Sequence, residues 1–233
     1  MIVSGDVNRE LKKRAAAKAV ELIKPGMVVG IGHGSTAIEA VYCLASLFET
    51  GKIRDIVVVP CSNHMVEETR KLGIPMSTLE EHPVVDLTID GADEVDPQLN
   101  LIKGGGGAFL HEKILAEASR REIIIVDETK LSPILGTRWA VPVEVISFGW
   151  RSQAEYLQTL GATVKLRQDS SCNPIKTDQG NLILDCRFGP IADPVRLAGQ
   201  IKGRAGIVEH GLFLGLASEV IVGCRSGVCH LKR

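Results

Sequence analysis

Residues 27–49 read MVVGIGHGSTAIEAVYCLASLFE, and the pattern of this stretch decides the fold class. Residues 27–31 form a short apolar run typical of a buried strand, and the glycine-rich residues 32–36 turn the chain into a predicted helix at about 37–49. Such strand–helix alternation, continued along the chain, predicts a parallel sheet in an α/β layered fold. The other elements predicted up to residue 126 are a helix at 8–23, strands at 56–60, 84–89 and 123–126, and helices at 65–73 and 109–119.

A different order of elements follows residue 140. It runs strand, helix, strand, strand, helix, which suits a small ferredoxin-like unit. The apolar runs GLFLGLA and EVIVG, within residues 205–233, are expected to add strands to the first domain. The elements of this small ferredoxin-like unit are predicted at 141–146, 151–160, 162–167, 181–188 and 193–202.

The two patterns together predict an α/β protein with a Rossmann-like parallel sheet domain and a smaller, inserted ferredoxin-like α+β domain. The predicted Rossmann-like catalytic domain consists of residues 1–136 plus 204–233, and the ferredoxin-like domain of residues 137–203. The sequence has no low-complexity linker at these points, so the predicted boundaries rest on the change of pattern alone.

The bulk composition excludes several classes of function. The chain has 233 residues, 45% of them hydrophobic and 24% charged, as in an ordinary soluble globular protein. Its formal net charge of −1 gives no general attraction to nucleic acid or to a membrane surface. No apolar run reaches the roughly 18 residues of a membrane span, and the N-terminus does not resemble a signal peptide. A cytoplasmic protein that binds neither nucleic acid nor membrane is therefore predicted.

The cysteines and histidines are dispersed along the chain. No two cysteines form a C-x-x-C pair, and no histidines have the H-x-x-x-H spacing of a metal site. We therefore expect reduced thiols, buried mostly as small apolar residues, and no metal. The six cysteines are at positions 43, 61, 172, 186, 224 and 229.

Polar or flexible residues follow four of the predicted strands. They are residues 32–36, 61–63, 90–93 and 127–130. Ligands of open parallel sheets bind outside the carboxyl ends of the strands. If these strands are parallel neighbours, the four segments share one edge of the sheet, and a binding site is expected there.

The loop at residues 30–36, GIGHGST, allows two interpretations. It is not G-x-G-x-x-G, no acidic residue ends the second strand, and the lysine of a P-loop is missing, so dinucleotides and nucleoside triphosphates are not indicated. A phosphate monoester could be held by its backbone N–H groups, by the Ser35 and Thr36 hydroxyls and by the start of the next helix. The alternative is a tight strand–helix turn that simply needs small residues.

The segment from Asp90 to Glu112 concentrates the groups that an active site needs. Carboxylates move protons, a lysine such as Lys103 stabilises developing negative charge, and glycines at 104–107 let a substrate approach backbone N–H groups. Taken singly, each residue also has a structural interpretation. Asp90 and Asp93 could cap a turn, Lys103 could be a surface group, and Glu112 could be a first-turn acid favoured by the helix dipole.

Other polar and aromatic residues near this segment are assigned structural roles. Glu94 and Glu117 are interpreted as surface acids, and His111 as a solvated neighbour of the site. Trp139 and Trp150 are interpreted as packing residues beside the second domain.

Taken together, the motifs resemble those of ribose-5-phosphate isomerase of the A type. The resemblance extends over essentially the whole chain, and the spacing of DGAD, KGGGG and a glutamate nine residues after the lysine is highly specific. It implies interconversion of D-ribose 5-phosphate and D-ribulose 5-phosphate in the non-oxidative pentose phosphate pathway, without metal or organic cofactor, by a homodimer or tetramer. The matching stretches are VGIGHGSTA, DLTIDGADEVD, LIKGGGGAFLHEKI, IIIVDETK and EHGLFLGLASEVIVG.

The resemblance also assigns roles to residues. It implies that Glu112 is the catalytic base and that Asp90, Asp93 and Lys103 are the other catalytic residues. The family usually has threonine or serine where this chain has His33. The substrate-binding residues that the resemblance implies are Lys12, His33, Gly34, Ser35, Thr36, Asp90, Gly91, Ala92, Asp93, Lys103, Gly104, Gly105, Gly106 and Lys130.

Three other functions are compatible with a fold of this kind. Two are enzymes, namely another sugar-phosphate isomerase and an amino-sugar phosphate deaminase. The third is a sugar-phosphate-sensing module of a transcription regulator, which would carry a helix-turn-helix and a basic surface. The N-terminal segment offers only one short basic helix, and a sensor does not require a base such as Glu112.

Overall fold

The chain folds into two compact units, as seen in a computed structural model that describes residues 4–233. The first unit runs up to Ala92 and takes up His111–Leu131 and Gly215–Arg233. The second unit consists of Asp93–Leu110 and Ser132–Leu214. The chain therefore leaves the first unit inside the DGAD motif, between Ala92 and Asp93.

The first unit is built on a six-stranded sheet with the order β13-β12-β6-β3-β1-β2. All its strands are parallel except β13, which pairs antiparallel with β12 at one edge. The parallel part has the strand order of a doubly wound fold of the 2-1-3-4-5 type. The strands are β1 (Val28–Ile31), β2 (Val57–Pro60), β3 (Leu87–Gly91), β6 (Glu122–Asp127), β12 (Glu219–Cys224) and β13 (Gly227–Lys232).

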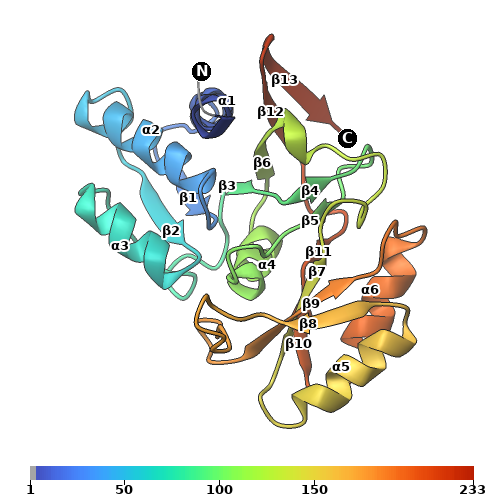
Figure 1. The fold of residues 1–233 in the computed structure, drawn as a ribbon. Coiled ribbons are helices and arrows are strands. Elements are labelled where there is room, and N and C mark those ends of the chain that lie inside the picture. The colour runs from blue at the N-terminus through green and yellow to red at the C-terminus, as the bar shows by residue number, and fades with distance from the viewer. Residues whose placement is uncertain (1–3) are drawn as a thin grey trace. The chain divides into compact units, whose positions relative to one another are not determined.

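Both faces of the parallel sheet are buried, because alternate residues of β1 and β2 pack into different clusters. Val29 and Ile31 contact the alanine-rich side of α1 and α2, whereas Val59 packs with Leu115 of α4 on the opposite face. Figure 1 shows α1 and α2 side by side, as expected from their contact. The helices of this unit, with a 3-10 turn, are α1 (Ser4–Val20), α2 (Ala37–Glu49), α3 (Asn63–Lys71), α4 (Phe109–Glu117) and η1 (Glu128–Lys130).

The order of the strands makes the carboxyl ends of β1 and β3 a topological switch point. These two strands are neighbours in the sheet, but the chain leaves β1 toward β2 and leaves β3 toward β6. At such a switch point the connections run to opposite sides and leave room for a ligand. Residues 32–36 follow β1, and Asp90 lies near the end of β3.

The second unit contains a four-stranded antiparallel sheet with the order β10-β7-β9-β8. Its chain order β7-α5-β8-β9-α6-β10 is that of a ferredoxin-like unit, and α5 and α6 cover one face in Figure 1. A separate three-stranded sheet has the order β11-β5-β4. The elements are β4 (Glu94–Val95), β5 (Leu101–Ile102), β7 (Val141–Val145), α5 (Trp150–Thr159), β8 (Thr163–Leu166), β9 (Leu182–Arg187), α6 (Pro194–Lys202), β10 (Ile207–His210) and β11 (Leu212–Phe213).

The predicted fold class is confirmed, with two corrections in detail. The run GLFLGLA does not extend the first sheet, because Leu212 and Phe213 pair antiparallel with β5 in the three-stranded sheet. The third predicted strand begins later, at Leu87, and contains Asp90 and Gly91, because both residues pair with β6. The predicted domain bounds, 1–136 with 204–233 and 137–203, stay a prediction.

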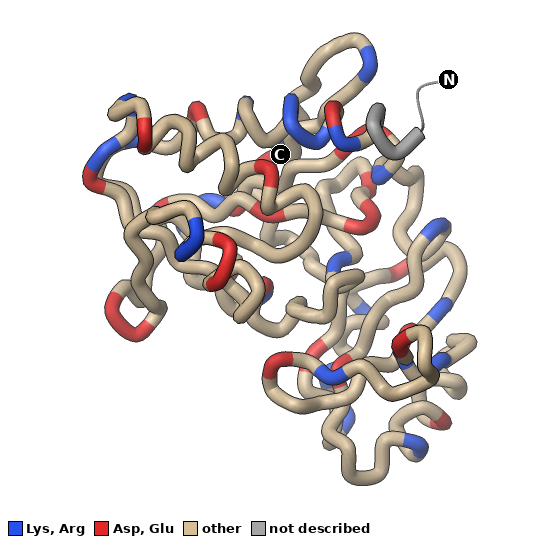
Figure 2. The backbone as a smooth tube through the Cα atoms, turned by 60° about the vertical axis from the view of Figure 1, so that its left-hand side comes forward, with Lys and Arg blue, Asp and Glu red and all other residues tan. Residues whose placement is uncertain are grey.

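Charged residues of both signs are spread over the chain. Basic and acidic residues are interspersed along the chain in both units (Figure 2). Within residues 4–233, none of the helices has the length and apolar character needed to cross a membrane.

Candidate active site

The end of β1 is shaped around the Asp90 carboxylate. Asp90 is fully buried, and its Oδ1 accepts a hydrogen bond from the Gly91 N–H at 2.6 Å. A β-carbon on Gly32 would lie 1.8 Å from the Asp90 carboxyl carbon, so only glycine fits at position 32. Gly34 has a φ of +109°, which side chains rarely adopt. The glycines of this loop thus serve both a close approach and a left-handed backbone.

Glu112 lies in the first turn of α4 and reaches the same loop. Its side chain is buried, and its Oε1 accepts a hydrogen bond from the His33 N–H at 3.4 Å. The N-terminal end of a helix stabilises a carboxylate electrostatically. The structure therefore brings Glu112 to the loop that follows β1.

Lys12 and Ser35 meet beside the N-terminus of α2. The Lys12 ammonium donates to the Ser35 hydroxyl at 2.9 Å, although the two residues are 23 positions apart. Thr36 is the N-cap of α2, and its side chain makes no capping hydrogen bond. A lysine, a hydroxyl and a helix N-terminus are the groups that hold a phosphate monoester. Lys130 stands in η1, directly after β6, the strand next to β3.

The His33 side chain makes contacts that the sequence did not indicate. Its Nδ1 lies 2.9 Å from the Ser62 hydroxyl, which also caps α3 by accepting from the Met65 N–H. The His64 ring meets the His33 ring edge-on, with the centroids 5.7 Å apart. His33 therefore connects the loop after β1 with the start of α3.

In the second unit, Asp93 is joined to the glycine loop, as we call residues 104–107. The Asp93 N–H donates to the Ile102 carbonyl at 2.8 Å, and its Oδ2 accepts from the Gly105 N–H at 2.7 Å. Gly104 and Gly107 have φ angles of +106° and +83°. A β-carbon on Gly104 would also lie 2.6 Å from the Phe109 ring. The loop therefore needs its glycines for backbone conformation and for space.

Lys103 is buried, with only 2% of its surface exposed. Its Nζ lies 5.4 Å from the centroid of the Phe213 ring, within range of a cation–π interaction. The backbone N–H of Lys103 donates to the Gly211 carbonyl at 2.9 Å. The interpretation of this lysine as a solvated surface group is therefore wrong, and its side chain lies in a low-dielectric environment.

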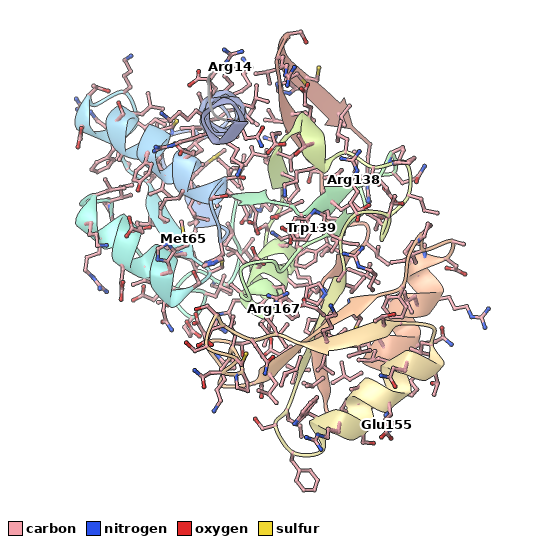
Figure 3. The ribbon with its side chains drawn as sticks, in the orientation of Figure 1. Arg14, Met65, Arg138, Trp139, Glu155 and Arg167 are labelled. Atoms are coloured by element: carbon pink, nitrogen blue, oxygen red, sulfur yellow. The ribbon has the colours of Figure 1, made fainter. Side chains whose placement is uncertain are left out.

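Arg167 holds the glycine loop from the side of its carbonyl groups. Its Nη1 donates to the Gly104 carbonyl at 2.8 Å and to the Gly105 carbonyl at 3.2 Å. Arg167 and Trp139, both labelled in Figure 3, line a cavity of about 480 Å³ within this unit, together with Asp93, Gly105 and Asp185. No local sequence signal pointed to Arg167, because it follows the loop by more than 60 residues.

Of the remaining structural interpretations, two are wrong and two are confirmed. Glu94 is fully buried, not a surface acid, because its carboxylate accepts hydrogen bonds from the backbone N–H groups of Gly136 and Trp139 at 3.1 and 3.0 Å. Trp139 is 39% exposed rather than packed. Glu117 is exposed and Trp150 packs against the core, as predicted. His111 is half-buried, with its Nδ1 3.1 Å from the Cys61 carbonyl.

The predicted site residues fall into two sets, each within one unit. The first unit holds Lys12, His33, Gly34, Ser35, Thr36, Asp90, Gly91, Ala92, Glu112 and Lys130. The second unit holds Asp93, Lys103, Gly104, Gly105 and Gly106. Within each set the contacts described above connect residues that are far apart in the sequence.

Comparison with known proteins shows the family of the chain. The family described as ribose 5-phosphate isomerase A (phosphoriboisomerase A) matches residues 57–227. The chain belongs to the ribose 5-phosphate isomerase A family. Within this family, the ribose-5-phosphate isomerase A of Chloroflexus aurantiacus is 57% identical over 220 residues, covering 94% of this chain and 92% of the relative. That of Desulfatibacillum aliphaticivorans is 53% identical over 222 residues, covering 95% and 96%.

Solved structures of ribose 5-phosphate isomerases have the same fold. One, a D-ribose-5-phosphate isomerase in complex with phospho-erythronic acid, gives a TM-score of 0.95 at 39% identity over 97% of this chain and 99% of the other. The enzyme of Plasmodium falciparum gives a TM-score of 0.93, also at 39% identity and with the same coverage.

Proposed function

We propose that Glu112 is the general base of an aldose–ketose isomerisation that interconverts D-ribose 5-phosphate and D-ribulose 5-phosphate. We infer the reaction from membership of the family, and the role of Glu112 from its position in the structure. The carboxylate is buried, reaches the loop after β1, and lies at the carboxyl-end edge of the parallel sheet. The reaction would place the enzyme in the non-oxidative pentose phosphate pathway.

The reaction moves a proton between C1 and C2 through an enediolate. Glu112 removes the proton from C2 of the open-chain aldose and returns it to C1, and the hydroxyl proton on the C2 oxygen moves to the C1 oxygen. Negative charge develops on the carbonyl oxygen of the substrate as the enediolate forms. Lys103 and N–H groups of the glycine loop stabilise this charge, since donors in a buried site stabilise such charge strongly. The burial of Lys103 supports this role.

Because the substrate is mostly a closed furanose, its ring must open first. Asp90 and Asp93 are suited to moving the proton of the ring oxygen or to holding hydroxyl groups. The contacts of Asp90 with Gly91 and of Asp93 with Gly105 fix the direction of both carboxylates. Fixed carboxylates act efficiently as acids or bases because little reorganisation is needed.

The phosphate of the substrate is assigned to the loop after β1. The backbone of residues 33–36, the Ser35 and Thr36 hydroxyls, Lys12 and Lys130 would bind it. The support is the contact between Lys12 and Ser35 at the N-terminus of α2. The remainder of the sugar is proposed to contact Gly91, Ala92, Gly104 and Gly106.

An assay of the purified protein tests the reaction. Ribose 5-phosphate should give ribulose 5-phosphate without release of ammonia, and EDTA should leave the rate unchanged because no metal takes part. Arabinose 5-phosphate should compete as a ligand. Ammonia release from an amino-sugar phosphate, with no ribulose 5-phosphate formed, would instead establish a deaminase.

Phospho-erythronic acid should inhibit this enzyme. It is bound by the structurally similar isomerase, and its carboxylate places negative charge on two oxygens much as an enediolate does. Ligands that resemble a transition state bind more tightly than substrates. We expect competitive inhibition with an inhibition constant below KM, and weaker inhibition by ribitol 5-phosphate, which lacks the carboxylate.

We also propose a homodimer or tetramer in the cytoplasm. Reducing conditions fit the six cysteines, none of which forms a disulfide. Light scattering should give two or four times the chain mass of 25.1 kDa. A monomer would contradict the proposed assembly, and recovery of the protein outside the cytoplasmic fraction would contradict the location.

A further inference from the structure

We propose that Arg167 is a positioning residue for the isomerisation, because it holds the glycine loop and, through one peptide group, the Asp93 carboxylate. This inference rests on the proposed function, in which Asp93 and the loop act on the substrate. Arg167 itself is not proposed to touch the substrate.

The Arg167 guanidinium is fixed on two sides. Its Nε and Nη2 donate to the two carboxylate oxygens of Asp185 at 3.0 and 2.5 Å, and its Nη1 donates to the carbonyls of Gly104 and Gly105. Only 14% of the Arg167 side chain is exposed. A bidentate pair of this kind restricts the guanidinium to one orientation. The third nitrogen is thereby aimed at the loop.

The peptide group between Gly104 and Gly105 connects Arg167 with Asp93. Its carbonyl oxygen accepts from Arg167 at 2.8 Å, and its N–H donates to Asp93 Oδ2 at 2.7 Å. Hydrogen bonds in such a chain polarise one another, and those to charged groups are the strong ones. Loss of the guanidinium would therefore weaken the bond that directs the Asp93 carboxylate.

The next peptide group supplies a donor. The Gly105 carbonyl accepts from Arg167 at 3.2 Å, and the N–H of the same peptide group belongs to Gly106. Within residues 4–233, this N–H makes no hydrogen bond, and Gly106 is exposed. An anchored carbonyl leaves the N–H at its other end pre-oriented for an oxygen of the substrate.

Arg187 provides a matched control in the same unit. It lines the same cavity from β9 and is exposed, but its hydrogen bond runs to the Arg138 carbonyl at 3.5 Å rather than to the glycine loop. Replacing Arg187 removes an equal charge from the cavity without loosening the loop. The comparison therefore separates positioning from a general loss of positive charge.

The experiment compares the variants Arg167→Ala, Arg167→Lys and Arg187→Ala with the parent enzyme. For Arg167→Ala we expect kcat to fall about 10–100-fold with KM nearly unchanged, somewhat less than the loss of a direct oxyanion donor typically causes. Arg167→Lys should recover only part of kcat, because an ammonium cannot bridge Asp185 and two carbonyls. Arg187→Ala should keep the parental kcat.

Inhibitor affinity adds a readout that a merely structural role would not move. In Arg167→Ala, the affinity for phospho-erythronic acid should fall by the same factor as kcat/KM, whereas that for ribitol 5-phosphate should stay constant, since only the former resembles the charged intermediate. Added guanidinium at millimolar concentration should enter the enlarged cavity and restore part of kcat in Arg167→Ala but not in Arg187→Ala.

The outcomes are distinct. A parental kcat in a folded Arg167→Ala would overturn the inference. An equal fall of kcat in Arg167→Ala and Arg187→Ala would also overturn it. So would a fall of kcat in Arg167→Ala together with equal losses of affinity for both inhibitors. If Arg167→Ala does not fold, Asp185→Asn, which keeps the size of the side chain, must show a smaller fall of the same kind. A parent enzyme without isomerase activity would refute the proposed function itself, which the control assay reveals before any variant is compared.

Discussion

Gly32 lies so close to Asp90 that a β-carbon at position 32 would be 1.8 Å from the Asp90 carboxyl carbon and from its Oδ1. Because Asp90 is fully buried on a central strand, it cannot move away without leaving its place beside β6. The Asp90 carboxylate therefore occupies space that a side chain at position 32 would fill. Gly32 lies in the loop that follows β1, the strand next to β3.

The substitution Gly32→Ala should abolish most of the activity. The methyl group must displace either the loop after β1 or the Asp90 carboxylate, and misplacement by about 1 Å can cost about 10²-fold in rate. Steady-state kinetics should show kcat/KM lower by at least that factor. Activity close to that of the parent would show that the Asp90 carboxylate is not needed where it lies.

Gly199→Ala is the matched control for this change. Gly199 lies in α6, and a β-carbon there would meet no atom within 4 Å. Alanine in a helix should raise the free energy of unfolding by about 0.5–1 kcal/mol without affecting kcat/KM. Thermal unfolding and the same kinetic assay check both expectations.

Glu112→Gln should lower kcat by about 10²–10⁴-fold, the usual contribution of a general base, while substrate still binds. Glutamine keeps the size of the side chain but cannot take the proton. The control is Glu117→Gln, on the exposed side of the same helix, which should leave kcat unchanged. Single-turnover kinetics with substrate deuterated at C2 separates proton transfer from binding. A Glu112→Gln enzyme with near-normal turnover would remove this residue from the role of base.

The parallel half of the fold is readable from sequence because its elements carry strong periodic patterns. The helix predicted at 37–49 is observed as Ala37–Glu49, and the strand predicted at 123–126 lies within Glu122–Asp127. The two-residue strands β4, β5 and β11 show no such pattern, because two residues are too few to establish a period. Their existence depends on partners elsewhere in the chain.

The site is predictable only where its residues are grouped in the sequence. Asp90, Asp93 and Lys103 stand in one segment with a recognisable spacing. The contribution of Arg167 comes from a hydrogen bond to a carbonyl 63 positions away, and any surface arginine would look the same in the sequence. The burial of Glu94 has a similar cause, since the N–H groups that satisfy it come from residues more than 40 positions later.

Lys12→Ala should raise KM for ribose 5-phosphate about tenfold or more and change kcat little, because the lysine is proposed to bind the non-reacting phosphate. Lys13→Ala, the adjacent and exposed lysine of α1, should leave KM unchanged. With ribose, which has no phosphate, the two variants should have the same low kcat/KM. A Lys12→Ala enzyme that discriminates between ribose and ribose 5-phosphate as strongly as its parent would contradict the assignment.

Cys186 should resist alkylation in the folded protein. It is fully buried, and burial, with a further effect of the Asp185 charge, raises the pKa of its thiol. A raised pKa removes the thiolate, which is the reactive form, at neutral pH. Iodoacetamide at pH 8 followed by peptide mass spectrometry should label the exposed Cys172 and Cys229 first and Cys186 only after denaturation. Labelling of Cys186 as fast as Cys172 would show that β9 opens readily.

His33→Thr tests whether the His33 imidazole takes part in the reaction. The hydrogen bond to Glu112 comes from the backbone N–H, which threonine also has, so kcat should stay within about threefold of the parent. The contacts of the His33 ring with Ser62 and His64 would be lost. Ser62, the N-cap of α3, would thereby lose its hydrogen bond with the imidazole. We therefore expect a modest fall in thermal stability, with His64→Ala, which removes the ring contact but leaves the hydrogen bond to Ser62, causing a smaller one. A fall in kcat of a hundredfold with unchanged stability would instead assign the imidazole a direct part in the reaction.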